Sequence, residues 1–140
     1  MNLKVKRTDP AATLPTRAHP TDAGLDLYAL NDVHLYASGR AIVPTGIAVA
    51  IPAGYYGQIQ GRSGLAARDG VVPAGGVIDA DYRGEVQVIL MNHSRNGWTA
   101  KAGDRIAQLV ILPIATPGVV EVAELPGTER GHGAMGSTGK

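Results

Sequence analysis

Apolar and polar residues alternate along much of this chain in short stretches, separated by Gly, Pro and Asn turn signals. Alternation with a period of two is typical of a half-buried β-strand, because successive side chains point to opposite faces. Many short strands at about ten-residue spacing predict an all-β sandwich, barrel or jelly roll. Asn96-Gly97 is a two-residue turn signal and predicts a hairpin between the strands at 85–92 and 98–100. The predicted strands are residues 3–7, 24–29, 33–36, 41–43, 47–51, 55–60, 85–92, 98–100, 105–112 and 119–122.

Residues 63–70 depart from the period-two pattern. Ser63 can cap a helix, two alanines can propagate it and Gly70 can end it. We therefore expect a helix of one or two turns, the only one in the chain. Its free N–H groups, beside Arg62 and the Ser63 hydroxyl, can bind an anion. The alternative is a capped surface helix with a solvated Arg62.

Residues 76–86, with the sequence GVIDADYRGEV, place two carboxylates and an aromatic ring near a predicted bend. Asp79 and Asp81 stand two apart, so an extended backbone points both the same way. The Arg-Gly pair after Tyr82 turns the chain into the next strand, which predicts a hairpin. Acids at such a bend can position a water or a metal-bound phosphate, and the ring can pack on a sugar or base. The alternative is an ordinary acidic turn.

The composition changes at Pro126. Residues 126–140, PGTERGHGAMGSTGK, contain five glycines and no apolar pattern. We expect residues 1–125 to form one β domain and residues 126–140 a flexible tail, mobile without a partner. The end of the tail resembles a phosphate-binding loop in spacing, but no strand precedes it and no helix follows, so a P-loop is rejected. A Gly-rich backbone with Arg130 can still wrap an anion.

Composition and charge exclude several classes of protein. Phe is absent and Trp98 is the only Trp, so the core must be built from Val, Ile, Leu and Ala. The absence of Cys excludes a disulfide scaffold and a thiolate metal site. A formal net charge of +1 argues against a nucleic-acid partner held by bulk charge. No apolar run is long enough for a signal peptide or a membrane span, so we expect a cytoplasmic protein without a membrane partner.

Five pieces of the sequence stand out as motifs: AGLDLYA, GRSGLA, GVIDADYRGEV, GDRIAQL and RGHGAMGSTG. In order and spacing, over nearly the whole chain, they resemble the motifs of the homotrimeric deoxyuridine triphosphate nucleotidohydrolases (dUTPases). The resemblance implies an all-β jelly roll, or distorted β-barrel, with one short helix, forming a homotrimer whose active sites are each built from three chains. It also implies cleavage of dUTP between the α- and β-phosphates, with Mg²⁺, to dUMP and pyrophosphate. That reaction supplies dUMP for thymidylate synthesis and keeps uracil out of DNA.

The same resemblance assigns roles to residues near the predicted bend. Asp79 is the carboxylate that orients and activates the attacking water. Tyr82 packs under the deoxyribose and leaves no room for a 2′-hydroxyl. Backbone groups up to Asp79 read the uracil edge. The substrate-binding residues implied in this region are Gly75, Gly76, Val77, Ile78, Tyr82 and Gln87.

The resemblance assigns the phosphate contacts to the small helix, one strand and the tail. Arg62, Ser63 and Gly64 meet the phosphates at the helix. Gln108 reaches them from its strand, and Asp26 lies near the water shell of the metal. The tail closes over the γ-phosphate, and the binding residues implied in it are Arg130, Met135, Gly136, Ser137 and Thr138.

The sequence departs from the family pattern at three positions. Met135 stands where an aromatic residue usually stacks on the uracil, and Ala134 precedes it in place of Gly. A thioether can cover a ring face, but less rigidly than an aromatic ring. Gly61 stands where Pro is frequent, which loosens the entry to the small helix. The reaction itself depends on none of these positions.

Two other functions share parts of the pattern. A dCTP deaminase on the same fold needs an acid on the strand after the bend, but that strand reads VQVIL. A non-catalytic nucleotide-binding module is expected to lack Asp79 or the tail, and both are present. We expect Asp104 and Arg105 to take part in a structural ion pair at a turn or subunit contact, and we expect structural roles for Asp81 and Arg83. The four His residues are scattered and suggest no metal site.

Overall fold

The computed structural model describes residues 2–134. Within that range the chain forms ten strands and one short helix. They are β1 (Lys4–Arg7), β2 (Leu25–Tyr28), β3 (Val33–Leu35), β4 (Arg40–Ala50), β5 (Tyr55–Gln60), α1 (Ser63–Asp69), β6 (Val71–Ala74), β7 (Val77–Ile78), β8 (Glu85–Asn92), β9 (Trp98–Ala100) and β10 (Arg105–Pro113).

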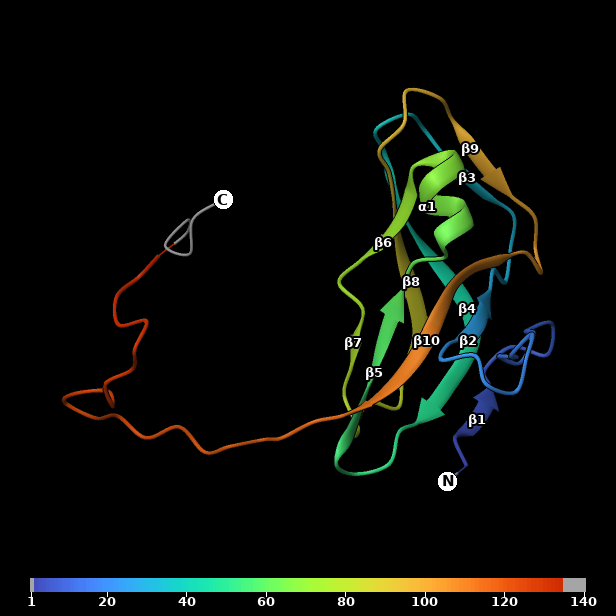
Figure 1. The fold of residues 1–140 in the computed structure, drawn as a ribbon. Coiled ribbons are helices and arrows are strands. Elements are labelled where there is room, and N and C mark those ends of the chain that lie inside the picture. The colour runs from blue at the N-terminus through green and yellow to red at the C-terminus, as the bar shows by residue number, and fades with distance from the viewer. Residues whose placement is uncertain (1, 135–140) are drawn as a thin grey trace.

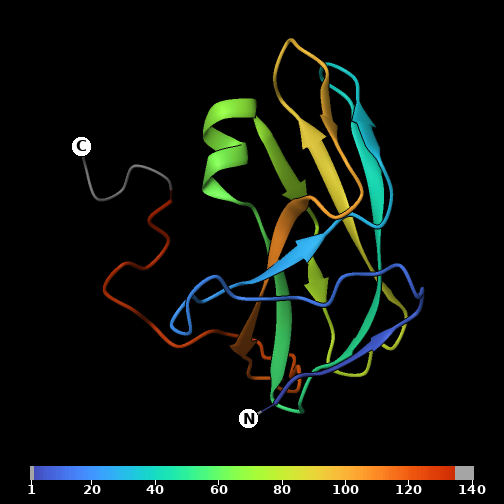
Figure 2. The ribbon, with the colours of Figure 1, turned by 90° about the vertical axis from the view of Figure 1, so that its right-hand side faces the viewer.

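Two four-stranded sheets face each other and form the body of the molecule (Figures 1 and 2). One sheet has the order β1-β4-β8-β6 and the other the order β2-β10-β5-β7, and β3 and β9 make a separate pair. All the strand pairs are antiparallel. Neighbours in each sheet come from distant parts of the chain, which is the arrangement of a jelly roll and confirms the predicted fold class.

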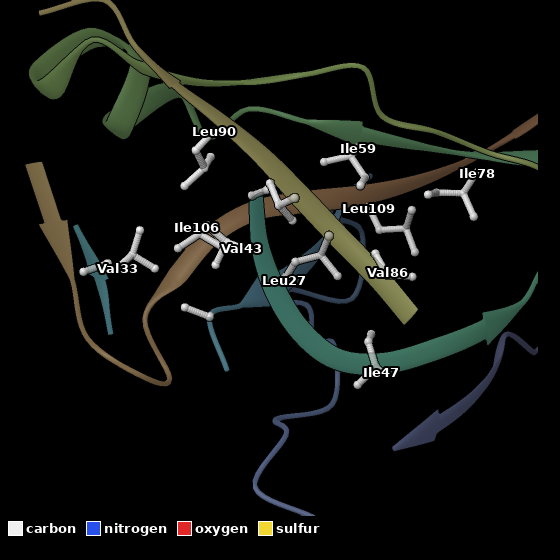
Figure 3. Close-up of a cluster of buried hydrophobic side chains, with 14 of the residues drawn as sticks. Leu27, Val33, Val43, Ile47, Ile59, Ile78, Val86, Leu90, Ile106 and Leu109 are labelled. Atoms are coloured by element: carbon white, nitrogen blue, oxygen red, sulfur yellow. The ribbon is translucent and has the colours of Figure 1, made fainter. Parts of the chain in front are cut away.

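The space between the two sheets is filled by aliphatic side chains (Figure 3). Strand β8 shows how the alternation produces this core, because Val86, Val88 and Leu90 are fully buried while Gln87 and Ile89 face outward. The buried cluster consists only of Val, Ile, Leu and Ala, as the lack of Phe requires. At roughly 25 cal/mol per Å² of apolar surface, this burial is the main stabilising contribution to the fold.

Strand β4 is one long strand, whereas the sequence predicted two strands at 41–43 and 47–51. Pro44 and Gly46 do not end the strand; the register with β8 shifts between Pro44 and Ala48, as in a β-bulge. Gly46 adopts a φ of 67°, and its N–H donates to the Glu85 carboxylate at 2.7 Å. Pro44 and Gly46 therefore bend the strand without ending it, because the Glu85 carboxylate on β8 accepts a hydrogen bond from the displaced Gly46 N–H.

The two predicted hairpins are wrong in their partners. Strand β7 pairs with β5 and β8 pairs with β4 and β6, so residues 76–86 connect two different sheets. Likewise β9 pairs with β3 rather than with β8. The buried amide of Asn92 holds the second connection, since its Nδ2 donates to the carbonyls of Asn96 at 2.8 Å and Tyr36 at 3.1 Å. The turn signals located the reversals correctly but carry no information about which strand lies alongside.

Helix α1 is confirmed, with a different start. Its N-cap is Arg62 rather than Ser63, and no side chain caps it. Gly70 ends the helix in the left-handed region at φ 66°, as predicted. Strand β6 follows immediately and was not predicted, since it contains Pro73. Proline is tolerated there because β6 is the last strand of its sheet.

After β10, residues 114–134 leave the sheets and carry no strand; we call them the C-terminal arm. The predicted strand at 119–122 is therefore wrong. In both ribbon views the arm runs away from the body of the molecule (Figures 1 and 2). Val119 is fully exposed, and Val120 and Leu125 are nearly so. The predicted division of the chain at residue 125 stays a prediction.

Candidate active site

A cavity of about 290 Å³, here called the Asp79 cavity, lies where the chain passes from β7 to β8. Asp79 comes directly after β7 and begins a tight turn, in which the Tyr82 N–H donates to the Asp79 carbonyl at 3.1 Å. This turn brings both Asp79 and Tyr82 to the cavity wall. Asp81 does not line it, so the expectation that an extended backbone presents both carboxylates together is wrong.

The backbone leading to Asp79 forms one edge of the cavity. Gly75 and Gly76 have φ values of 66° and 97°, a region that favours glycine. The Gly76 carbonyl accepts the Ile59 N–H at 2.8 Å, and a Cβ on Gly76 would stand 2.9 Å from the Ile59 carbonyl oxygen. Strand β7 pairs with β5 on one side only. Its other edge has no strand partner among the described residues and can form hydrogen bonds with a planar polar ligand.

Gly76, Val77, Ile78 and Gln87, all predicted as substrate-binding, line the Asp79 cavity, while Gly75 lies just outside. The apolar wall of this cavity was not predicted. Ile42 on β4 and Ile89 on β8 are paired in register and face outward, with Ile42 63% exposed. An isoleucine at an outward position of an alternating strand is the signal that could have identified this wall.

A second cavity, of about 470 Å³ and here called the Arg62 cavity, lies at the start of α1. Arg62, Arg68 and Arg105 line it together with Asp22 and Asp26. The predicted phosphate contacts Ser63, Gly64 and Gln108 line the same cavity. Three guanidinium groups at one cavity can bind the oxygens of a phosphate chain.

Asp26 joins two of these arginines. Its carboxylate oxygens lie 3.3 Å from Arg62 Nε and 3.4 Å from Arg105 Nη1. Arg62 Nη1 also donates to the Arg105 carbonyl at 3.2 Å. The Asp104 carboxylate accepts the Lys101 N–H at 2.8 Å within this chain, and its expected ion pair at a turn or subunit contact stays a prediction. Asp26 therefore orients the guanidinium groups, and Arg105 was missed as a residue of this cavity.

Two other residues of the Arg62 cavity are held by close contacts. Gln108 Nε2 donates to the Gly61 carbonyl at 2.8 Å. A Cβ on Gly24 would stand 2.8 Å from Gln108 Cδ, so a glycine is required opposite this side chain. Arg68 pairs with Asp69, with 2.7 Å between Nη2 and Oδ2. That hydrogen bond raises the pKa of Arg68 and lowers the pKa of Asp69.

Comparison with known proteins identifies the family. The dUTPase family model matches residues 10–139. The deoxyuridine 5′-triphosphate nucleotidohydrolase of Arabidopsis thaliana is 51% identical over 136 residues, covering 97% of this chain and 82% of that protein. The enzyme of the same name from Gloeobacter violaceus is 50% identical over 143 residues, covering 99% of this chain and 97% of that protein. The chain belongs to the dUTPase family.

Solved dUTPase structures share its fold. A variant of the Staphylococcus bacteriophage 80alpha dUTPase with dUpNHpp matches with a TM-score of 0.93 and 32% identity, covering 99% of both chains. A variant of the dUTPase from phage phi11 of S. aureus matches with a TM-score of 0.83 and 31% identity, covering 89% of this chain and 98% of that one. The latter structure describes the coordination of a structural Mg(II) ion.

In this member of the dUTPase family, one chain does not bring all the predicted residues together. The Asp79 cavity and the Arg62 cavity have no lining residue in common. Arg130 lies on the C-terminal arm, where its Nε donates to the Gly133 carbonyl at 3.0 Å, and it lines neither cavity. The remaining predicted tail contacts lie outside the described residues: Met135, Gly136, Ser137 and Thr138.

Within residues 2–134, no group of three or more His, Cys, Asp or Glu side chains could hold a metal ion. The helix in the same range is neither long nor apolar enough to cross a membrane.

Proposed function

We propose that this protein hydrolyses dUTP to dUMP and pyrophosphate, with the Asp79 carboxylate as the general base. One observation carries the proposal. In a chain of the dUTPase family, the turn after β7 brings the Asp79 carboxylate and the Tyr82 ring to the same cavity. The reaction supplies dUMP and removes dUTP that would otherwise place uracil in DNA.

The general-base step needs a carboxylate that can reach a water molecule. Asp79 is exposed at the cavity wall. It takes a proton from the attacking water as the oxygen approaches the α-phosphorus, and pyrophosphate leaves. Phosphoryl transfer depends mainly on positioning and charge neutralisation, so no covalent intermediate is required.

The unpaired edge of β7 supports recognition of uracil by backbone groups. Uracil presents an acceptor–donor–acceptor edge, whereas cytosine presents acceptor–acceptor–donor. A backbone edge fixed by pairing to β5 cannot rearrange to suit the wrong base. Cytosine would leave buried polar groups without partners, which costs roughly 1–3 kcal/mol for each group.

The Arg62 cavity is the proposed place of the phosphates and of Mg²⁺. A triphosphate supplies oxygen ligands itself, so Mg²⁺ needs only one or two protein carboxylates. Asp22 and Asp26 line the cavity and fit that modest requirement, with Asp26 acting through water. When bound, Mg²⁺ neutralises charge on the phosphate oxygens. Arg62, Ser63 and Gln108 bind the phosphates and hold them in line for attack.

We also propose that the active unit is a homotrimer. The separation of the two cavities in one chain supports this, because dUTP must contact both Asp79 and the phosphate-binding residues. The C-terminal arm adds support, since contact with a neighbouring chain would bury its exposed side chains Val119, Val120 and Leu125, which is favourable. In the trimer, Arg130 and the tail reach the site of another chain.

Pyrophosphate release from dUTP, dTTP, dCTP and UTP, with Mg²⁺ and with EDTA, tests the proposal. We expect rapid release from dUTP alone and its loss in EDTA. The dCTP reaction is also assayed for ammonia, which would indicate a deaminase. Binding of dUTP without turnover would indicate a non-catalytic nucleotide-binding module.

A further inference from the structure

The ring of Tyr82 lies directly against the backbone of Gly84. A Cβ built on Gly84 would meet the Tyr82 hydroxyl oxygen and would stand 2.6 Å from Cζ and 2.9 Å from Cε2. Non-bonded carbon atoms pack at about 3.5–4.0 Å, so these positions cannot be occupied together. Any side chain at residue 84 therefore displaces the ring.

The backbone itself does not require glycine at this position. Gly84 is not among the glycines with positive φ, so alanine can adopt its conformation. The three atoms nearest to the built Cβ all belong to Tyr82. The need for glycine thus comes from the ring and not from a strained turn.

Other contacts hold the far end of the ring. The Tyr82 hydroxyl donates to the Glu85 carbonyl at 2.9 Å. Glu85 is fixed in turn, because its carboxylate accepts the Gly46 N–H of the β4 bulge at 2.7 Å. Tyr82 remains 43% exposed and lines the Asp79 cavity. The Gly84 backbone and the Glu85 carbonyl therefore fix the Tyr82 ring, while the exposed part of the ring can contact a ligand.

We propose that Gly84 is a positioning residue for sugar discrimination: its bare backbone sets the Tyr82 ring where the ring excludes a 2′-hydroxyl. The inference rests on the proposed function, which places the deoxyribose on Tyr82. A ring seated on Gly84 and bonded to Glu85 is a fixed wall, whereas a displaced ring leaves room for a ribose. Because the obstacle to a Cβ is the end of a side chain, an alanine moves the ring rather than the fold.

The test is a double-mutant cycle with Gly84→Ala, Tyr82→Ala and both together, measuring kcat/KM for dUTP and UTP. Gly84→Ala should lower the dUTP/UTP ratio by about tenfold or more, the size expected for one small group in a pocket. In the Tyr82→Ala background the same change should have no further effect, because no ring remains to be moved. A general structural role for Gly84 would instead lower the ratio in both backgrounds.

Gly97→Ala is the matched control. Gly97 has no positive φ, and a Cβ there would lie 3.5 Å from the nearest atom, the Leu35 carbonyl oxygen, which is an ordinary contact. Its dUTP/UTP ratio should equal that of the wild type. The ratio of the dissociation constants for dUMP and UMP should change across the same four proteins in the same way, and this measurement does not depend on turnover.

An unchanged ratio in Gly84→Ala would overturn the inference, as would an equal fall in both backgrounds. If Gly84→Ala does not fold, the double variant decides, because without the ring it should fold with the thermal midpoint of Tyr82→Ala. Failure of the double variant to fold would also overturn the inference. A wild type that releases no pyrophosphate from dUTP would refute the proposed activity instead, and the thermal midpoints of the cycle would still test the contact.

Discussion

Asp79 and Asp81 stand two residues apart, but Asp81 does not line the Asp79 cavity. We expect Asp79→Asn to lower kcat for dUTP by ~10²–10⁴-fold, because an amide can hold a water but cannot take its proton. Binding of dUTP should remain, since the base-reading edge and the arginines are unchanged. Pyrophosphate release and calorimetric titration with a non-hydrolysable dUTP analogue measure the two effects.

Asp81→Asn is the matched control for that substitution. It makes the same chemical change at an exposed residue of the same turn, outside the cavity, so kcat should stay within a factor of about two. Activity of Asp79→Asn close to that of the wild type, or equal losses in both variants, would remove Asp79 from the general-base role.

The resemblance of five motifs in order predicted Asp79, Tyr82 and Arg62 as site residues, although each segment alone also fits an ordinary turn or a capped surface helix. Residues that only shape the cavity were not predicted. Ile42 and Ile89 carry no such signal, because their role depends on the pairing of β4 with β8. A linear pattern contains no information about that register.

At the scale of elements, alternation predicted most strands, but the breaker at Gly46 was misread. Two constraints act at Gly46, its positive φ and the lack of room for a Cβ, and comparing Gly46→Ala with Gly54→Ala separates them. Gly54 has a φ of 81° and nothing within 4 Å of a built Cβ, so alanine there should cost about 1–2 kcal/mol of unfolding free energy. Gly46 has a φ of 67°, and its Cβ would stand 2.8 Å from Ala12 Cβ, so alanine should cost about 1–3 kcal/mol more.

Urea unfolding at one fixed protein concentration measures both glycine variants, because association shifts apparent stability. Equal costs at the two positions would mean that the loop around Ala12 yields and that only the backbone angle matters. A larger cost at Gly46 would confirm that the bulge of β4 is packed against the N-terminal loop.

The contact between α1 and β9 should be sensitive to acid. Asp69 accepts hydrogen bonds from Arg68 and from Trp98 Nε1, and the Arg68 bond is the main cause of its lowered pKa. A lowered folded pKa means that the contribution to stability is present at neutral pH and is lost as pH falls through that pKa. The usual pKa of an aspartate is about 4, so we expect the fluorescence of Trp98 to change only at a pH below that value.

Trp98 is the only Trp, so its emission reports this contact alone. Asp69→Asn should remove the acid transition. Asp32→Asn is the control, because the pKa of Asp32 is also lowered, mainly by its hydrogen bond to Lys101, but it has no bond to the indole. Persistence of the transition in Asp69→Asn would assign it to another group.

At the scale of the whole molecule, most of the elements were predictable, but their strand partners were not. Both predicted hairpins turned out to be connections between different sheets, because cross-strand pairing depends on packing that a turn signal does not encode. The predicted strand at 119–122 has an alternating sequence but forms no strand in the described part of the chain. The C-terminal arm and the two separate cavities are features that a partner chain would complete.

Complementation between two inactive variants tests whether active sites are shared between chains. One variant is Asp79→Asn, which keeps the tail, and the other is truncated after Gly127, which removes Arg130 and the tail but keeps Asp79. Each alone should be inactive. If a site combines Asp79 of one chain with the tail of another, every mixed trimer retains one intact site. Equal mixing then gives about a quarter of wild-type activity, because about three in four trimers are mixed and each has one intact site in three.

The two variants are co-expressed with different tags, and mixed trimers are isolated by successive capture on both tags. Size-exclusion chromatography verifies that the isolated assemblies have the mass of a trimer. If these trimers form but release no pyrophosphate from dUTP, each site uses the Asp79 and the tail of the same chain. The arm would then have to fold back over its own Asp79 cavity, and its exposed valines would be covered within one subunit. Recovery near a third of wild-type activity in the isolated mixed trimers, one intact site in three, excludes that arrangement, since no chain in the mixture carries both parts.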